Sequence, residues 1–130
     1  MKTCAAASLF SLSSVSASAF EIAALCRAGK NLDAVKKHYA ADIVSHEVND
    51  PMKLTRGLDA VMGKNQWWID NHEIHERKVD GPWPNGDQFV LRHTFTITPK
   101  ATGKRTVMDE IALYTVKNGK IVEETFFYGG

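Results

Sequence analysis

Apolar and polar side chains alternate along most of the last third of the chain. From Phe89 to Thr98 the sequence reads FVLRHTFTIT, and this period of two is typical of a strand that has one face on the core and one in water. Residues 105–117 and 120–128 have similar composition, and Asn118 and Gly119 between them suit the positive φ angles of a tight hairpin turn. The pattern therefore predicts three consecutive antiparallel strands over 88–98, 105–117 and 120–128.

The first half of the chain has helical spacing instead. Ile22, Leu25 and Cys26 recur every three to four residues, and Gly29 indicates the end of that helix. A second helix is predicted after Asn31, which is a suitable N-cap, with Leu32, Val35 and Tyr39 on one face. Residues 43–48 are expected to form a short strand that ends at 49–51.

The third predicted helix has the clearest stripe of apolar side chains along one face. A rotation of about 100° per residue from Leu58 places seven residues on one face and Trp67 on the opposite side. Those seven are Leu58, Val61, Met62, Asn65, Trp68, Ile69 and His72. Two polar groups, Asn65 and His72, therefore share the face expected to be buried. After this helix a strand is expected over 76–79, followed by a turn-rich loop over 80–87.

Composition excludes several classes of function. A chain of 130 residues suits one domain. Its 16 Lys and Arg residues nearly balance 15 Asp and Glu residues, so we expect no nucleic-acid partner. No apolar run is long enough to cross a membrane. The two cysteines, Cys4 and Cys26, have no metal-ligand spacing.

No cofactor or metal site is predicted either. The chain has no glycine-rich phosphate loop and no nucleotide-binding fingerprint. The sequence HEIHE, which begins at His72, lacks the HExxH order of a zinc protease, and no third ligand can be named.

The N-terminal segment 1–19 has two interpretations. Lys2, an apolar stretch and the small residues Ala17, Ser18 and Ala19 fit a secretory signal cleaved before Phe20. The stretch is, however, rich in serine and poor in leucine for a signal. The alternative, slightly favoured, is an uncleaved disordered or helical extension of a cytoplasmic protein. In both cases the domain is expected to occupy residues 20–130, and the segment up to about Ala17 is expected to add little to the core.

The order of these elements resembles that of a known group of proteins. Four short segments have this resemblance: Arg27-Ala28-Gly29-Lys30, Arg56-Gly57-Leu58-Asp59-Ala60-Val61, Trp67-Trp68 and Asn118-Gly119-Lys120-Ile121-Val122. They are similar to SnoaL-like and ketosteroid-isomerase-like sequences of the nuclear transport factor two-like superfamily, over about residues 20–128. The resemblance implies an α+β fold: a cone-shaped, curved antiparallel sheet wrapped around three helices, with an internal, mostly apolar pocket and frequent dimerisation. Ketosteroid isomerase uses an aspartate base with a tyrosine and a protonated aspartate as donors, but no trio here can be placed on those positions.

His93 and Glu110 are the candidate catalytic residues. His93 interrupts an apolar strand face, where it is either an acid/base group or a structural core histidine. Glu110 is the one charge on the face of Met108, Ala112 and Tyr114, where burial would raise its pKa, or else it faces solvent on the outer side. If Thr98 pairs with Arg105, His93 lies opposite Glu110, and we expect the two to form a hydrogen bond inside the cavity.

Trp68, His72 and Tyr114 are expected to shape the walls of the ligand-binding cavity. A plain core tryptophan is the more common case for Trp68, and a structural role is an equal alternative for His72. Trp67 and Trp83 are assigned to a dimer surface or to loop packing. Glu47 could line the mouth of the pocket, whereas Glu123 and Glu124 are expected at the surface.

Two classes of function remain open from the sequence. One is acid/base chemistry, as in an isomerase, cyclase or dehydratase, on a small apolar carbonyl compound. The other is a ligand-binding or dimerisation module without catalysis. A homodimer is expected in either case, because residues 105–117 carry large apolar side chains on both faces of the strand.

Overall fold

The computed structural model describes residues 2–48 and 53–129, with side chains from residue 15 onward. The elements in chain order are α1 (Lys2–Arg27), α2 (Asn31–His38), β1 (Tyr39–Glu47), β2 (Lys53–Arg56), α3 (Leu58–Asn71), β3 (His72–Asn85), β4 (Gln88–Pro99), β5 (Thr106–Lys117) and β6 (Lys120–Tyr128).

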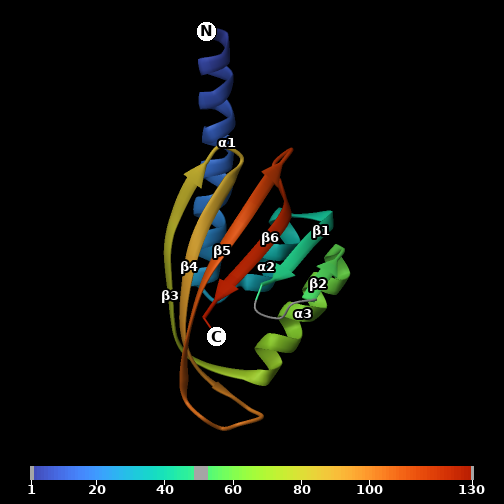
Figure 1. Ribbon diagram of the computed structural model, residues 1–130, viewed down its shortest axis with the longest axis vertical. Coiled ribbons are helices and arrows are strands. Elements are labelled where there is room, and N and C mark those ends of the chain that lie inside the picture. The colour runs from blue at the N-terminus through green and yellow to red at the C-terminus, as the bar shows by residue number, and fades with distance from the viewer. Residues whose placement is uncertain (1, 49–52, 130) are drawn as a thin grey trace.

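The six strands form one curved sheet in the order β2-β1-β6-β5-β4-β3. Its edges, β2 and β3, do not meet, and the helices lie together on one side of it (Figure 1). This confirms the predicted α+β fold of three helices and a curved sheet. The sheet is mixed rather than wholly antiparallel, because β1 and β6 run parallel. Local alternation predicts a strand but not which distant strand it will join, and β1 and β6 are far apart in the sequence.

The three predicted C-terminal strands are confirmed. Asn118 and Gly119 have φ angles of 53° and 75° at the tight turn between β5 and β6. The predicted register between β4 and β5 is also confirmed, since His93 pairs with Glu110 and Phe89 with Tyr114. The inner face of β4 is buried as the alternation indicates, at Phe89, Leu91, His93, Phe95 and Ile97.

Strand β3 is longer than predicted. The segment 80–85, expected as part of a loop, continues the strand to Asn85. β3 is an edge strand, and its register shifts between Asp80 and Trp83. An edge position and a bulge are the two places where a sheet tolerates proline and glycine, so Gly81 and Pro82 did not end the strand as their composition suggested.

The start of β1 also differs from the prediction. Tyr39, expected on the second helix, begins β1, so the strand starts four residues before Ile43. Asn31 is the first residue of α2 rather than its N-cap, and no side chain caps this helix. The expected end of the strand at 49–51 lies outside the described residues.

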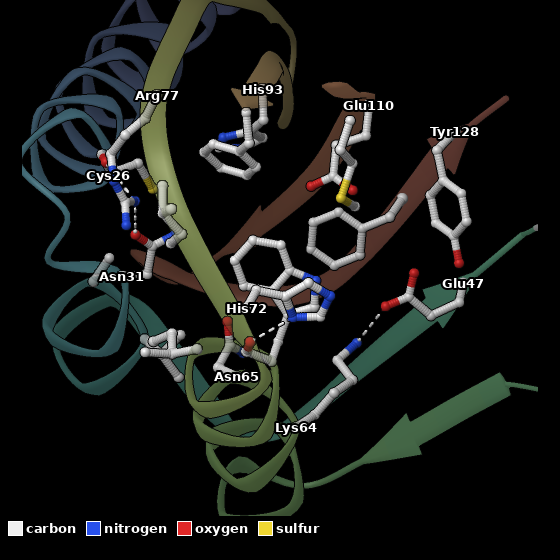
Figure 2. A pocket seen from close by; sticks show the side chains of 18 of the residues that line it. Cys26, Asn31, Glu47, Lys64, Asn65, His72, Arg77, His93, Glu110 and Tyr128 are labelled. Carbon is white, nitrogen blue, oxygen red and sulfur yellow. Dashed lines mark hydrogen bonds and ion pairs between the residues drawn. The ribbon is translucent and has the colours of Figure 1, made fainter. Parts of the chain in front are cut away.

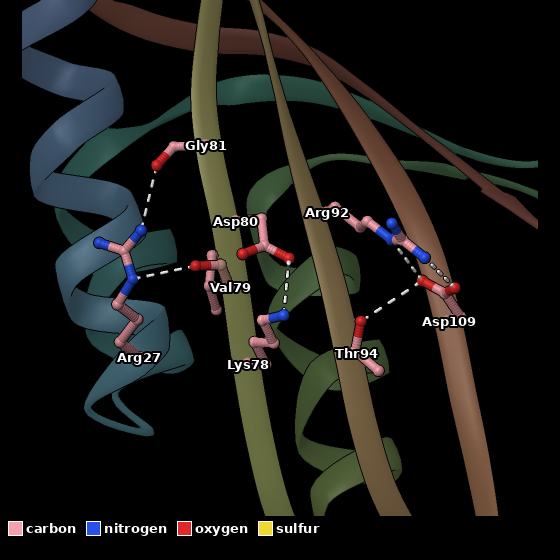
Figure 3. Close-up of polar contacts among 8 residues, drawn as sticks. All are labelled: Arg27, Lys78, Val79, Asp80, Gly81, Arg92, Thr94 and Asp109. Carbon is pink, nitrogen blue, oxygen red and sulfur yellow. Dashed lines mark hydrogen bonds and ion pairs between the residues drawn. The ribbon is translucent and has the colours of Figure 1, made fainter.

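Helix α1 continues through the segment expected as an extension. Val15 and Ala19 are 4% and 0% exposed and belong to the core, so packing begins before residue 20. Near the other end of the helix, Nε and Nη2 of Arg27 donate to the carbonyls of Val79 and Gly81 at 3.1 and 3.0 Å, which ties α1 to β3 (Figure 3). No described helix is long and apolar enough to span a membrane.

The outer face of the sheet carries exposed apolar side chains. Val107, Ile111 and Phe127 are 67%, 36% and 43% exposed, and Arg92 and Asp109 form an ion pair of 2.7 Å (Figure 3). Covering these side chains in a homodimer would remove apolar surface from water. The homodimer stays a prediction: we expect sedimentation at tens of micromolar, an order-of-magnitude choice near ordinary dimer affinities, to give twice the monomer mass. A monomer alone at that concentration would contradict it.

Candidate functional site

A cavity of about 490 Å³ lies on the inner side of the sheet (Figure 2). All three helices and strands β1, β3, β4, β5 and β6 contribute to its wall. The lining residues are Ile22, Cys26, Asn31, Ala34, Val35, Tyr39, Glu47, Lys64, Asn65, Trp67, Trp68, Ile69, His72, Ile74, Arg77, His93, Phe95, Met108, Glu110, Tyr114, Phe126 and Tyr128. The five residues predicted for the site, His93, Glu110, Trp68, His72 and Tyr114, are all among them.

Glu110 is a partly buried carboxyl on β5 at the wall of this cavity (Figure 2). Burial, and then the negative charges of Glu47 and Glu124, raise its pKa from 4.5 to about 8, while Lys64 opposes this shift. Desolvation and like charges both disfavour the ionised form of a carboxyl. At neutral pH Glu110 is therefore mostly protonated and can donate a hydrogen bond.

His93 lies opposite Glu110 in the sheet, but the expected hydrogen bond between them is not formed. Nε2 of His93 lies 3.4 Å from the hydroxyl oxygen of Tyr114, and Nδ1 is buried without a partner. Pairing in the register sets the Cα atoms opposite each other but leaves the side-chain rotamers free, which is why the prediction failed. Burial and the nearby Arg77 lower the pKa of His93 from 6.5 to about 4, so its imidazole is neutral at neutral pH.

The end of α3 and the first residue of β3, His72, supply an aromatic wall; His72, expected on the helix, begins the strand instead. The rings of Trp68 and His72 are stacked, with centroids 4.4 Å apart and an interplanar angle of 17°. Nδ1 of His72 lies 2.7 Å from the carbonyl oxygen of Trp68, so this nitrogen donates and fixes the ring at the start of β3. Trp67, expected on the far side of the helix, is 62% exposed and also lines the cavity.

A chain of polar contacts that the sequence did not predict runs from the buried Glu124 to the cavity wall. The buried carboxylate of Glu124 accepts hydrogen bonds from the hydroxyls of Tyr39 and Ser45, the latter at 2.7 Å. Lys64 from α3 then donates to Ser45 at 2.6 Å. It also donates to Glu47 at 3.2 Å (Figure 2). The chain thus connects the core to the cavity wall.

Glu124 is 1% exposed, and the prediction that it lies at the surface was wrong. Glu123 is exposed as expected, and pairs with His46 at 3.4 Å. A register shift between Thr115 and Val116 explains the error, because Thr115 pairs with Glu123 whereas Val116 pairs with Ile121. The extra residue reverses which side chains of β6 point inward. The sequence around Glu123 and Glu124 does not indicate this bulge, so it could not predict which of the two points inward.

Burial raises the pKa of Glu124, and the bonds from Tyr39 and Ser45 oppose that shift. Burial also keeps the pKa of Tyr39 and of Tyr114 well above 10. Both phenols are therefore protonated throughout the physiological range. Among the described residues no group of three His, Cys, Asp or Glu side chains is placed to hold a metal ion.

Comparison with known proteins identifies the family of this domain. The SnoaL-like domain family matches residues 15–128. A solved structure from Mesorhizobium loti, described both as a candidate SnoaL-like polyketide cyclase and as a carbohydrate phosphatase, is 50% identical with a TM-score of 0.84. That match covers 88% of this chain and 98% of the other. No curated protein matches the sequence.

More distant structures share the fold alone. A protein with a ketosteroid-isomerase-like fold from Catenulispora acidiphila, in complex with trimethylamine, has a TM-score of 0.68 at 16% identity, over 83% of this chain and 82% of the other. A candidate hydroxylase from Streptomyces galilaeus has the same TM-score at 18% identity, over 92% and 91%. The names differ in chemistry although the fold is shared, so the activity has to be argued from the residues of this cavity.

Proposed function

Because the chain belongs to the SnoaL-like domain family, whose members bind small molecules, we propose that its cavity binds a small apolar carbonyl compound and that Glu110 transfers a proton on it. The observation that carries the proposal is the position of Glu110: a carboxyl with a pKa near neutrality, at the wall of a largely apolar cavity. A general acid or base works best when its pKa lies close to the working pH.

The cavity has the size and lining that this role needs. Ligand sites generally measure about 300–1,000 Å³ and combine an apolar wall with few polar groups, and 490 Å³ falls within that range. Val35, Ile69, Phe95, Met108 and Phe126 supply apolar contacts. A compound of one or two fused rings would be held by these side chains and by the stacked Trp68 and His72.

The proton transfer uses the two states of Glu110. Its carboxylate form would take a proton from the carbon next to a carbonyl group, which leaves an enolate. The resulting carboxyl would return the proton to another position of the ligand or to the same one. Tyr114, which is protonated, is the donor available to the enolate oxygen. Its hydroxyl would turn from His93 to that oxygen and stabilise it by a hydrogen bond in a site of low polarity.

Proton exchange with an enolisable ketone tests this proposal. With tetralone in deuterated water, we expect the wild-type protein to accelerate loss of the proton next to the carbonyl, with a rate that rises with pH and has a midpoint at about 8. Glu110→Gln should lower the rate by about 100-fold or more, the usual contribution of a positioned acid or base.

Asp109→Asn is the matched control, because Asp109 is the neighbouring residue of β5, is exposed and points away from the cavity, where it pairs with Arg92. It should leave the exchange rate unchanged. Equal rates for wild type and Glu110→Gln would refute the role of Glu110.

The second candidate function is a binding module without catalysis. It is favoured by the bonds that already engage the polar groups, since Tyr114 contacts His93 and Lys64 contacts Ser45 and Glu47. In that case Glu110 would serve only as a neutral donor to the ligand. Glu110→Gln would then keep ligand affinity, and neither protein would accelerate exchange.

A further inference from the structure

Arg77 places a positive charge at the end of the cavity formed by α1, α2 and β3 (Figure 2). Its guanidinium is held from several sides. Nη1 donates to the side-chain oxygen of Asn31 at 3.0 Å and lies 3.4 Å from the carbonyl oxygen of Cys26. Cζ lies 5.6 Å from the centre of the Phe95 ring, and a Cβ at Gly29 would come within 3.5 Å of it. The guanidinium group of Arg77 is thus fixed in position before any ligand binds.

This guanidinium has no carboxylate partner in the described part of the chain. Its two bonds both use Nη1 and both go to neutral oxygens. The side chain is only partly exposed. Nε and Nη2 thus keep donors for a ligand, and an arginine fork matches the two oxygens of a carboxylate. An unpaired charge in a poorly solvated site is costly, and an anion would remove that cost.

A second donor without an acceptor lies beside it. Arg77 pairs with Phe95 in the sheet and His93 with Val79, so Arg77 and His93 are diagonal neighbours. Nδ1 of His93 is buried, 3% of the residue is exposed, and no described group accepts from it. When the phenol of Tyr114 donates to Nε2, the single proton of the neutral imidazole resides on Nδ1. That N–H is then free for an oxygen of the ligand.

The remaining charges of the wall do not balance Arg77. Lys64 and Glu47 form an ion pair of 3.2 Å with each other. The Glu110 carboxyl is mostly protonated at neutral pH, as derived above. Among the lining residues one positive charge thus remains, at the Arg77 end, while the carboxyl of Glu124 lies outside the lining and accepts from Tyr39 and Ser45.

We propose that the ligand of this cavity carries a carboxylate, and that Arg77 binds this group with His93 as a second donor. The inference rests on the proposed small-molecule function and narrows its ligand to apolar organic acids. Arg77 and Glu110 both face the cavity from different strands, β3 and β5. The carboxylate would therefore orient the ligand, and a different part of the ligand would contact Glu110.

The test compares two probes of nearly the same size and shape, naphthoate and naphthamide, of which only naphthoate carries a charge and two acceptor oxygens. Their affinities are measured at neutral pH by quenching of tryptophan fluorescence and by calorimetry. We expect the wild-type protein to bind naphthoate about tenfold more tightly than naphthamide, or about 1.4 kcal/mol. Arg77→Met keeps the apolar stem and should bind both probes equally, at the affinity of the amide. Arg77→Lys should keep part of the preference, because it retains the charge but loses the fork.

Arg56→Met is the matched control, because Arg56 is an exposed arginine on β2 that does not line the cavity. It should keep the full preference for naphthoate. Equal binding of both probes by the wild type overturns the carboxylate inference and needs no variant, so it does not depend on how Arg77→Met folds. A preference that persists in a folded Arg77→Met protein overturns the role of Arg77. In both cases the proton exchange by Glu110 still tests the proposed function separately.

Discussion

Replacing Glu124 with alanine is expected to lower the free energy of unfolding by about 3 kcal/mol. The change removes the acceptor for Tyr39 and Ser45 and leaves two hydroxyl protons in the core without an acceptor, although Ser45 still accepts from Lys64. A buried polar group that loses its partner costs about 1–3 kcal/mol. In a domain of this size the loss corresponds to a fall of about 10 °C in melting temperature, which calorimetry or circular dichroism would measure.

Glu123→Ala is the natural control for that experiment. Glu123 precedes Glu124 in β6, but its side chain is 52% exposed and makes a surface pair with His46. Exposed pairs contribute about 0–1 kcal/mol, so this change should hardly move the melting temperature. Glu124→Gln keeps an acceptor oxygen and should fall between the two. If Glu124→Ala were as stable as Glu123→Ala, the buried chain of polar contacts would have no structural role.

Glu110 is expected to make the protein less stable as the pH rises. Its pKa is about 8 in the folded state against 4.5 ordinarily, so between these values the folded state holds a proton that the unfolded state has released. The free energy of unfolding therefore falls with rising pH across this window and levels off above pH 8. Since the side chain is partly exposed, we expect a loss of about 2–3 kcal/mol rather than the full value of the shift.

Glu110→Gln should remove this loss. The variant should match the wild type below pH 4.5 and exceed its stability by about 2–3 kcal/mol above pH 8, which denaturant titrations at a series of pH values would show. His93, with its pKa lowered from 6.5 to about 4, adds stability as the pH rises through that range, and this contribution cancels in the difference. Asp109→Asn should not produce the same gain. A constant difference between wild type and Glu110→Gln at all pH values would contradict the raised pKa.

Much of the site could be predicted from the periodic spacing of apolar side chains along the strands and helices. A regular hairpin places every second residue of β4 and β5 on one face, so His93, Glu110 and Tyr114 could be assigned to the cavity once the register was set. The helical stripe expected from Leu58 gave Trp68 and His72 in the same way, although the helix ends at Asn71 and His72 begins β3. Periodicity is a reliable signal where a segment has no irregularity.

The parts that were missed depend on irregularities or on distant contacts. The bulge that turns Glu124 inward has no mark in the sequence of β6, and the extension of β3 through Gly81 and Pro82 depends on its position at the sheet edge. Arg77 lay within the strand expected over 76–79, but its contacts with Asn31 and Phe95 join residues far apart in the chain. Such contacts follow from the assembled fold and not from local pattern.

The carboxyl of Glu110 can be titrated directly. In protein labelled with carbon isotope at the glutamate carboxyl groups, nuclear magnetic resonance follows each group as the pH changes, and the signal lost in Glu110→Gln identifies Glu110. A proton-transferring residue in a poorly solvated cavity predicts a midpoint at about 8. A midpoint near 4.5, the ordinary value for this side chain, would contradict the account.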